Sequence, residues 1–427
     1  EIVMEMDRAI IPGLLTVGAG LLTAWYFNRE QRRKDQESIR RLEEQTASLE
    51  AEIRSLKAAV GEHKLKEKEA SDGDAQLKEL SERLKKLGEQ KKRVMKIGTR
   101  DSELAMWQAK HVNAMLKRLG LETEIVGMKT MGDIDLKSAL STFSNKGIFT
   151  KELDAALLLK KVHIAVHSMK DLPTTLEDGL FLGAVLERGA IEDALVISAK
   201  HKNNKSITSL DTLPTGSLVG TSALRRRAVL RRHYPGLQVD DVRGNLQTRL
   251  AKLDNPKLKF DALILARTGL ERVNLGDRIS EVLDSKRFGY AVSQGALAVV
   301  CRTADGLSRE VLSKLNHAPT YLRTAAERSL LKTLEGGCKV PIAVTSDYDK
   351  KTGTMRLKGW VVALDGSREA VAELTSTEIS GTLEHATEKA VKLGQAVGEE
   401  LRKRGAEEIL VECRGMPMGH QAPKKAS

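Results

Sequence analysis

Cationic side chains recur directly after the short apolar segments of this sequence, beside Gly, Ser or Thr. Such positions present backbone N–H groups, and guanidinium groups bind carboxylates or phosphates in a bidentate manner. A single arginine in such a place is usually a surface residue, but repetition at equivalent positions favours a shared site for an anion with several acidic groups. These cations are Arg100, Lys170, Arg225, Arg226, Arg243, Arg249 and Arg272.

Asp171 is an acidic residue among these cations, at the end of the segment 167–171. A carboxylate in such surroundings is most often an ion-pair partner that holds the cations together. It is also the natural group to stabilise substrate cations and to handle protons. The residues alone leave both interpretations open.

Cys338 differs from the other two cysteines in its surroundings. It follows Gly336 and Gly337 and precedes a lysine, in a loop after a predicted helix. Small neighbours give access and the lysine favours the thiolate, so nucleophilic or attachment chemistry is plausible. Cys301 and Cys413 read as buried apolar residues. No metal-ligand spacing accompanies any of the three, and we expect no metal site.

The composition excludes several classes of protein. With 41% hydrophobic residues among 427 and only three cysteines, the chain folds around a sizeable core without a disulfide framework. The 70 Lys and Arg exceed the 58 Asp and Glu, which favours an anionic ligand. Aromatic residues make up 3%, which argues against single-stranded nucleic-acid binding. Neither a phosphate-binding P-loop nor a dinucleotide-binding glycine motif occurs.

Strand and helix patterns alternate from residue 94 onward. Apolar runs at 94–98, 124–128, 162–166, 217–220, 237–242 and 263–266 each lead into a helical stretch. This alternation predicts an α/β body with largely parallel sheets, whose ligands bind at the carboxyl ends of the strands. The last hundred residues predict a small α+β domain, with helices at 321–334 and 383–404 and hairpins between them.

The first 93 residues are of a different kind. Residues 9–27 carry no charge and would rise about 28 Å as a helix, so we expect a membrane anchor, with a targeting segment as the alternative. Residues 28–93 are rich in charge, with apolar residues at coiled-coil spacing. They predict a helical stalk for self-association or a partner helix, or else a long solvated helix.

Eight ordered segments make the sequence resemble the hydroxymethylbilane synthases, also called porphobilinogen deaminases. The resemblance runs from about residue 94 to residue 415, and the first 93 residues have no counterpart in the family's common catalytic core. The segments are 98–102, 107–108, 146–153, 166–173, 220–226, 243–245, 293–296 and 334–341.

The resemblance implies two lobes like those of periplasmic binding proteins, with the active cleft between them, and a third domain that carries the cofactor cysteine. We expect domain 1 at 94–190 and 291–316, domain 2 at 191–290 and the cysteine domain at 317–427, after an N-terminal segment at 1–27 and a stalk at 28–93. The implied cofactor is dipyrromethane, held by a thioether to Cys338. Four porphobilinogen molecules are deaminated and added to it head to tail, and hydroxymethylbilane is released for heme or chlorophyll biosynthesis.

The same resemblance implies roles for individual residues. Asp171 would be the catalytic acid–base and would stabilise pyrrolic cations. Three positions depart from the family's frequent residues: Ala223 replaces a serine, Thr142 a lysine and Ser293 a glycine. The residues implied to bind cofactor or substrate are Arg100, Gln108, Lys146, Ser168, Lys170, Thr221, Ser222, Arg225, Arg226, Arg243, Arg249, Arg272 and Gln294.

Two other functions compete with the synthase. A non-catalytic periplasmic-type protein that binds polycarboxylates would explain the arginines, but it would leave Cys338 and Asp171 without a role. A nucleic-acid binder has only the charge in its favour, and we expect no nucleic-acid partner. For localisation we expect a eukaryotic organelle, a plastid or a mitochondrion, with a membrane tether through 9–27. The cytoplasm is the alternative.

Overall fold

The computed structural model describes residues 94–130, 150–201, 204, 206–334 and 340–415, with positions 48, 51, 52 and 55. The chain separates into one unit of residues 1–95 and 113–124 and a second of residues 96–112 and 125–427. The predicted anchor and nearly all of the predicted stalk lie outside the described residues. Among the described residues, no helix combines the length and apolar character that a membrane span needs.

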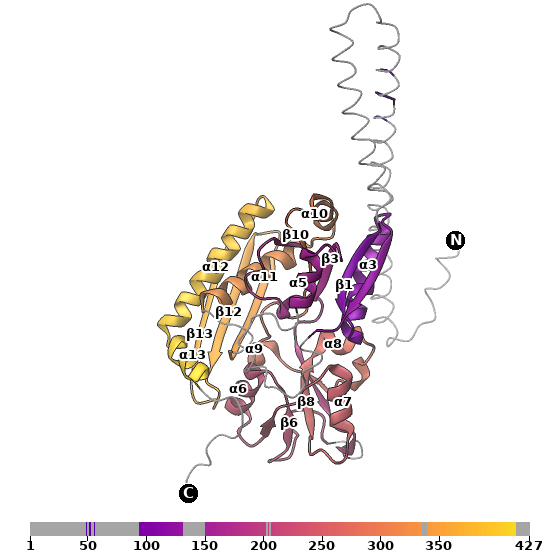
Figure 1. The fold of residues 1–427 in the computed structure, drawn as a ribbon. Coiled ribbons are helices and arrows are strands. Elements are labelled where there is room, and N and C mark those ends of the chain that lie inside the picture. Colours follow the sequence, from indigo (N-terminus) through magenta and orange to yellow (C-terminus); the bar gives the residue numbers. More distant parts are fainter. Residues whose placement is uncertain are drawn as a thin grey trace, which may run out of the picture. The chain divides into compact units, whose positions relative to one another are not determined.

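A five-stranded sheet has the order β2-β1-β3-β10-β4 and combines strands from residues 95–185 with one from residues 297–302. Its strands β1, β3 and β10 are labelled in Figure 1. Its core consists of apolar side chains from the strands and from the helix at 151–158, including Leu153, Ala165 and Val300. Its strands are β1 (Met95–Arg100), β2 (Thr123–Met128), β3 (Ile164–Ser168), β4 (Leu180–Val185) and β10 (Leu297–Arg302). The accompanying helices are α3 (Glu103–Arg118), α5 (Lys151–Leu158), α10 (Gly306–Ser313) and the 3-10 turn η1 (Met169–Asp171).

A second five-stranded sheet has the order β7-β6-β8-β5-β9. Each of β6, β7 and β8 leads into a helix, as the alternation predicted. The strands are β5 (Asp193–Ile197), β6 (Leu218–Gly220), β7 (Gln238–Asp240), β8 (Ala262–Ala266) and β9 (Glu281–Val282). The helices are α6 (Leu224–His233), α7 (Leu246–Asp254), α8 (Arg267–Arg272) and α9 (Ser285–Phe288), with 3-10 turns η2 (Ala199–His201) and η3 (Gly276–Arg278).

The C-terminal part is a three-stranded antiparallel sheet with helices packed on it, which is the predicted α+β arrangement (Figure 1). Gly394 lets α12 approach α11 closely, because a Cβ there would lie 2.1 Å from the carbonyl oxygen of Ala326. The elements are β11 (Ile342–Asp349), β12 (Thr354–Val362), β13 (Glu369–Ser376), α11 (Ala318–Thr333), α12 (Leu383–Lys403) and α13 (Ala406–Gly415).

The expectation of largely parallel sheets is wrong, because both large sheets are mixed. β10 runs antiparallel to β3, with its first residue Leu297 opposite Ser168 at the carboxyl end of β3. Likewise β5 begins at Asp193 opposite Ala266, the last residue of β8. The chain crosses between the sheets along 186–192 and 283–296. After the first crossing, β5 enters the second sheet beside the carboxyl end of β8, and after the second crossing, β10 enters the first sheet beside the carboxyl end of β3. Each entering strand is therefore antiparallel to its neighbour.

The two crossing segments are hydrogen-bonded to each other. The Gly189 N–H donates to the Gly295 carbonyl at 3.1 Å, and the Leu186 N–H donates at 3.0 Å to the carbonyl of Leu297, the first residue of β10. The carboxyl ends of β3 and β8 therefore adjoin a paired connection between the sheets, where the predicted site residues accumulate.

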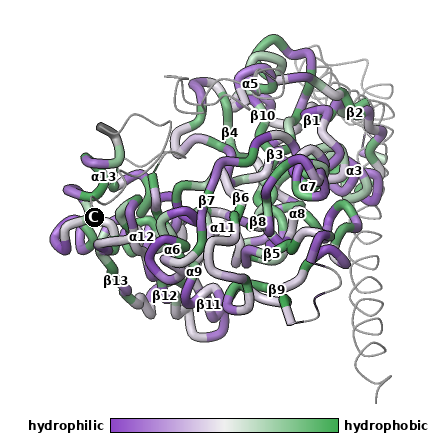
Figure 2. Tube along the Cα trace, turned by 90° about the horizontal axis from the view of Figure 1, so that it is seen from below, coloured by the Kyte–Doolittle hydropathy of each residue, from purple (hydrophilic) through white to green (hydrophobic). Residues whose placement is uncertain are grey.

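Some strand boundaries also differ from the prediction. The expected strand at 162–166 is β3, two residues later, and the expected strand at 237–242 is only the three-residue β7. The helix after β6 carries little apolar surface, since five of its ten residues are arginines, and it is mostly hydrophilic in Figure 2. Its core contacts come from Ala228, Val229 and Leu230.

Candidate functional site

The predicted site residues occupy strand ends and the turns that follow them. Arg100 is the last residue of β1 and Ser168 the last of β3. The turn η1 then carries Lys170 and Asp171. Thr221 and Ser222 follow β6, and the remaining cations lie on α6, α7, α8 and the loop before α7. Gln294 lies in the second crossing segment.

Asp193 is the shared counter-charge of a buried ion cluster with Arg225 and Arg226. Its Oδ2 accepts from Nη2 of Arg225 at 2.7 Å, and its Oδ1 accepts from Nη2 of Arg226 at 2.7 Å. The Gln294 amide donates to the same Oδ1 at 2.9 Å. The Asp193 side chain is fully buried. Burial acts to raise the pKa of Asp193, but Arg225 and Arg226 outweigh it and hold that pKa well below its usual range.

Backbone carbonyls complete the hydrogen bonding of this cluster. Arg225 Nη1 donates to the carbonyls of Phe288 and Gly289, both at 3.3 Å. Arg226 Nη1 donates to the carbonyl of Ile264 at 2.9 Å. Both guanidinium groups are thus largely engaged by the protein, which explains how they are kept charged in a buried place.

Asp171 has a different environment, although it lies near the same cations. It makes no ion pair with any other described residue. Burial lowers the pKa of Lys170 to about 8, and Asp171 acts in the opposite direction. Burial, followed by the charge of Arg226, lowers the pKa of Arg249 to about 10, and Asp171 again opposes the shift. Asp171 therefore lies within electrostatic range of Lys170 and Arg249 but forms no ion pair with a residue that the structure describes.

Arg243 and Arg249 lie on the loop after β7 and on the helix that follows it. Arg243 Nε donates to Asp241 Oδ2 at 2.6 Å, and Arg249 Nε donates to the Gly244 carbonyl at 2.8 Å. The Ser222 hydroxyl donates to the Val242 carbonyl. The electrostatic influences of Arg226, Asp171 and Arg243 on Arg249 place these groups in one neighbourhood.

The remaining predicted residues are also positioned by side-chain contacts; they belong to the first sheet and its helix α3, except Thr221, which follows β6 of the second sheet. Gln108 on α3 donates to the Ser168 hydroxyl at 2.8 Å. Arg100 lies close enough to His167 to contribute, after burial, to lowering the pKa of that imidazole to about 4. Thr221 is buried, and its hydroxyl accepts from the Ala223 N–H at 3.4 Å.

Arg272 is the last residue of α8 and makes its contacts with α3 and the second crossing segment. Burial lowers its pKa to about 10, and Glu271 acts in the opposite direction. Its Nη2 donates to the Gly295 carbonyl at 2.7 Å, and its guanidinium lies over the ring of Trp107. The mutual electrostatic influences thus link Lys170, Asp171, Arg225, Arg226, Arg243 and Arg249, whereas Arg272 contacts Gly295 and Trp107.

Two predicted residues, Cys338 and Lys146, lie outside the described residues, as does Thr142. The other two departures from the family pattern have a visible consequence. Ala223 is the N-cap residue of α6, where no side chain caps the helix. Ser293 has a φ of +63°, in the left-handed region where glycine is favoured, and its buried hydroxyl has no hydrogen-bond partner in the described structure.

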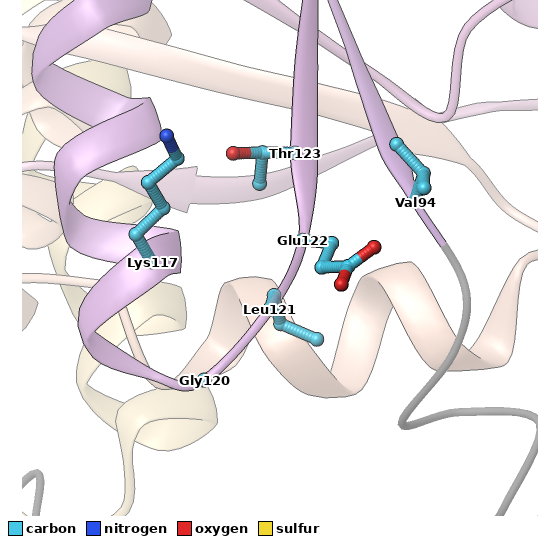
Figure 3. Close-up of a pocket in the computed structure, with 6 residues that line it drawn as sticks. All are labelled: Val94, Lys117, Gly120, Leu121, Glu122 and Thr123. Carbon is cyan, nitrogen blue, oxygen red and sulfur yellow. The ribbon is translucent and has the colours of Figure 1, made fainter.

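A surface pocket in the smaller unit contains none of the predicted site residues. It is lined by the end of α3 and the start of β2, where Lys117 and Thr123 lie on either side of the turn through Gly120 (Figure 3).

Sequence reasoning missed Asp193 and a second buried ion pair. Arg188 Nη1 donates to Glu327 Oε1 at 2.6 Å and Nη2 to Oε2 at 3.0 Å, and the Ser293 N–H donates to Glu327 Oε2 at 2.7 Å. This pair ties the crossing segments to α11. The only sequence signal for Asp193 was a carboxylate directly before an apolar strand, which is an unusual place for a solvated residue.

Family models match most of the described chain. The model "Porphobilinogen deaminase, dipyromethane cofactor binding domain" covers residues 95–310, and "Porphobilinogen deaminase, C-terminal domain" covers residues 321–403. Among solved structures, a periplasmic domain of Bordetella pertussis BvgS matches 55% of this chain and 91% of its own, at 15% identity and a TM-score of 0.33. That likeness is too weak to support a conclusion.

Curated relatives from cyanobacteria agree with the family models. The porphobilinogen deaminase of Synechococcus elongatus is 46% identical over 322 residues, 75% of this chain and 95% of that protein. The porphobilinogen deaminase of Gloeobacter violaceus is 45% identical over 321 residues, 74% of this chain and 93% of that protein. The expectation of a eukaryotic organelle has no support here, and the cytoplasmic alternative fits these relatives. The chain belongs to the porphobilinogen deaminase, or hydroxymethylbilane synthase, family of transferases, which carry a dipyrromethane cofactor and condense porphobilinogen into hydroxymethylbilane.

Proposed function

We propose that Asp171 is the acid–base residue of the synthase reaction and that the cations near it bind the carboxylates of cofactor and substrate. The observation that carries this proposal is the contrast between two acids. Asp193 neutralises Arg225 and Arg226 at 2.7 Å, whereas Asp171 has no ion-pair partner among the described residues. A carboxylate without a close cation keeps its capacity to accept a proton or to face a new positive charge.

The available donors match a ligand with several carboxylates. Lys170 and Arg249 make no ion pair with a described residue. Arg226 Nε is buried and has no hydrogen-bond partner in the described structure. Each pyrrole unit brings an acetate and a propionate, so charge complementarity favours these positions. The donor set therefore fits the dipyrromethane cofactor and the growing chain.

Each group has a separate task in the reaction. Dipyrromethane, when bound, supplies the free pyrrole carbon to which porphobilinogen is added. Lys170 and Arg249 would hold carboxylates and orient the pyrrole rings. Loss of ammonia from porphobilinogen leaves a positive charge that the Asp171 carboxylate stabilises, and the proton released when the new carbon–carbon bond forms passes to that carboxylate. The Gln108–Ser168 hydrogen bond fixes the strand end from which η1 starts.

Cys338 is our proposed attachment site for the cofactor. Cys301 and Cys413 are buried, and burial raises the pKa of the Cys301 thiol to about 11, which disfavours the thiolate. Intact-mass measurement on the purified chain tests the assignment. We expect an increment of two pyrrole units in the wild type and in Cys301→Ala, and none in Cys338→Ala. An increment retained in Cys338→Ala would overturn the assignment.

We propose that the two mixed sheets are the cores of two lobes that close around the ligand. Domain 1 would comprise 94–190 and 291–316, and domain 2 would comprise 191–290. Support comes from the strand ranges, since β5 to β9 all lie within 191–290 and the sheet of β1 to β4 is completed by β10 at 297–302. The paired crossing segments would then act as the hinge. Belonging to a family of enzymes argues against the non-catalytic polycarboxylate binder.

For the N-terminal region we keep the proposal of a membrane tether through 9–27 and a separable stalk at 28–93. The family models begin at residue 95, which supports a catalytic body that does not need the preceding segment. Membrane flotation of the full chain and of a 28–427 truncation tests the tether. Flotation of the full chain alone is expected, and recovery of the full chain away from the membranes would reject it.

A further inference from the structure

Trp107 and Arg272 form a contact for which the roles above provide no explanation. Trp107 lies on α3, beside the first sheet, and Arg272 is the last residue of α8, beside the second. The guanidinium carbon of Arg272 is 5.5 Å from the centroid of the indole ring. This separation is within the range of a cation–π interaction.

A second contact fixes the other side of the Arg272 guanidinium. Nη2 donates to the Gly295 carbonyl at 2.7 Å, in the second crossing segment. Gly189 of the first crossing segment makes room for it, because a Cβ there would lie 3.2 Å from Nη2 and 2.8 Å from the Thr268 hydroxyl. The indole ring and two glycines thus define the place of this side chain.

Arg272 retains hydrogen-bonding capacity in this position. It makes no ion pair with a described residue, and neither Nε nor Nη1 has an acceptor in the part of the chain that the structure describes. With its pKa lowered only to about 10, the guanidinium stays charged at neutral pH. A half-buried guanidinium with two free donor atoms is arranged for a carboxylate.

The α3 helix touches the second sheet's helices at neighbouring positions, which orients the indole ring. Gln247 on α7 donates to Glu103 Oε2 at 2.5 Å. Gly269 on α8 faces Leu104, which would lie 3.7 Å from a Cβ at that glycine. Residues 103, 104 and 107 therefore share the face of α3 that meets α7 and α8.

We propose that Trp107 is a positioning residue that holds the Arg272 guanidinium so that Nε and Nη1 bind a carboxylate of the growing pyrrole chain. This inference rests on the proposed role of Arg272 in substrate binding. Among the described residues, the Arg272 guanidinium contacts Trp107 and the Gly295 carbonyl and makes no hydrogen bond to Lys170, Asp171 or Arg249, so it would hold a pyrrole unit other than the one reacting at Asp171. Trp107 would then affect porphobilinogen addition and leave cofactor loading unchanged.

The test compares Trp107→Leu with Trp107→Phe in the full chain. We expect Trp107→Leu to keep the cofactor mass, to raise KM for porphobilinogen about tenfold, and to accumulate partly extended enzyme complexes in native mass spectra. Trp107→Phe keeps an aromatic face and should stay within about threefold of the wild type. His111→Ala is the matched control, because His111 stacks on Trp107 with ring centroids 5.3 Å apart and is exposed. Its KM should not change.

Two further variants keep the test decisive. In an Arg272→Leu background, Trp107→Leu should add no further change in KM, since the indole acts only through the guanidinium. Gly189→Ala places a methyl group against Nη2 of Arg272 and leaves Trp107 unchanged, so it should also raise KM for porphobilinogen. This variant provides the test if Trp107→Leu folds poorly. Additive effects in the double variant, or a wild-type KM and complex distribution in Trp107→Leu or Gly189→Ala, would overturn the inference. A wild-type chain without the cofactor mass would instead contradict the proposed attachment.

Discussion

Asp193 and Asp171 are two carboxylates in one field of arginines, but their surroundings differ. Asp193 begins β5, is fully buried, and is bound by Arg225, Arg226 and Gln294. Asp171 ends η1, is only half-buried, and has Lys170 and Arg249 within electrostatic range but no ion pair among the described residues. Asp193 holds the buried arginines in place, and we propose that Asp171 takes part in the reaction.

This difference separates the arginines that the protein itself neutralises from the cations that make no ion pair with a described residue. Buried arginines need a permanent counter-charge, since a desolvated cation without one is costly. Asp193 provides that charge on the protein side. Lys170 and Arg249 make no such ion pair with a described residue, and in our proposal they bind the ligand while Asp171 serves the reaction.

The largest expected effect is on the free energy of unfolding when the buried Asp193 is replaced. Asp193→Ala leaves Arg225 and Arg226 buried without their counter-charge, so the free energy of unfolding should fall by about 3–5 kcal/mol in urea titrations. Asp241→Ala is the control, because the Asp241–Arg243 pair is partly exposed, and it should cost at most about 1 kcal/mol. Equal losses in the two variants would mean that Asp193 is not the shared counter-charge.

Near Asp171, the titration of Lys170 should affect substrate binding and protein stability in opposite directions. Because the pKa of Lys170 is about 8, this side chain loses its charge above pH 8, and KM for porphobilinogen should rise by up to about tenfold per pH unit there. Lys170→Arg keeps the charge and should flatten that rise. A wild-type KM profile identical to that of Lys170→Arg would reject the role of Lys170.

The loss of the Lys170 proton that weakens substrate binding should increase the stability of the fold. In the unfolded chain a lysine titrates near 10.4, so between about pH 8 and 10.4 the unfolded state binds more protons than the folded one. The contribution of Lys170 to the free energy of unfolding therefore rises with pH across this window. Urea titrations of the wild type and Lys170→Arg at pH 7.5 and 9.5 measure this difference.

A smaller effect is expected where α6 positions the buried arginines. Ala223→Ser would provide the missing side-chain cap at the start of that helix and should stabilise the fold by about 1 kcal/mol. Thr382→Ala removes an existing cap from α12, where the Thr382 hydroxyl accepts from the His385 N–H, and should cost about as much. No gain from Ala223→Ser would show that the α6 terminus is already satisfied.

The smallest effect concerns the residue before Gln294. Ser293→Gly relieves the positive φ and removes a buried hydroxyl without a partner, and should raise the free energy of unfolding by about 0.5 kcal/mol. Lys160→Gly is the matched control, with a φ of +59° at an exposed position. If only Lys160→Gly raised the free energy of unfolding, the buried Ser293 hydroxyl would not be destabilising.

Local sequence patterns predicted the elements that carry the site, and long-range contacts escaped them. The sequence pattern correctly predicted the end of β6 at Gly220, but it placed the end of β3 at residue 166, two residues before Ser168. The ion pair between Asp193 and Arg225 joins residues 32 positions apart, across strands whose antiparallel order was not expected. Nothing in a local pattern predicts which of two acids meets an arginine, because that choice depends on the crossing of the chain between the sheets.

The most direct test of the account is the kcat of Asp171→Asn, measured together with its intact mass and unfolding free energy. Asparagine keeps the size and removes the charge. We predict a cofactor mass and a stability within about 1 kcal/mol of the wild type, with kcat reduced by about 10² to 10⁴. Near-normal kcat with full cofactor loading, or a loss of stability as large as that of Asp193→Ala, would contradict the separation of a structural acid from a reactive one.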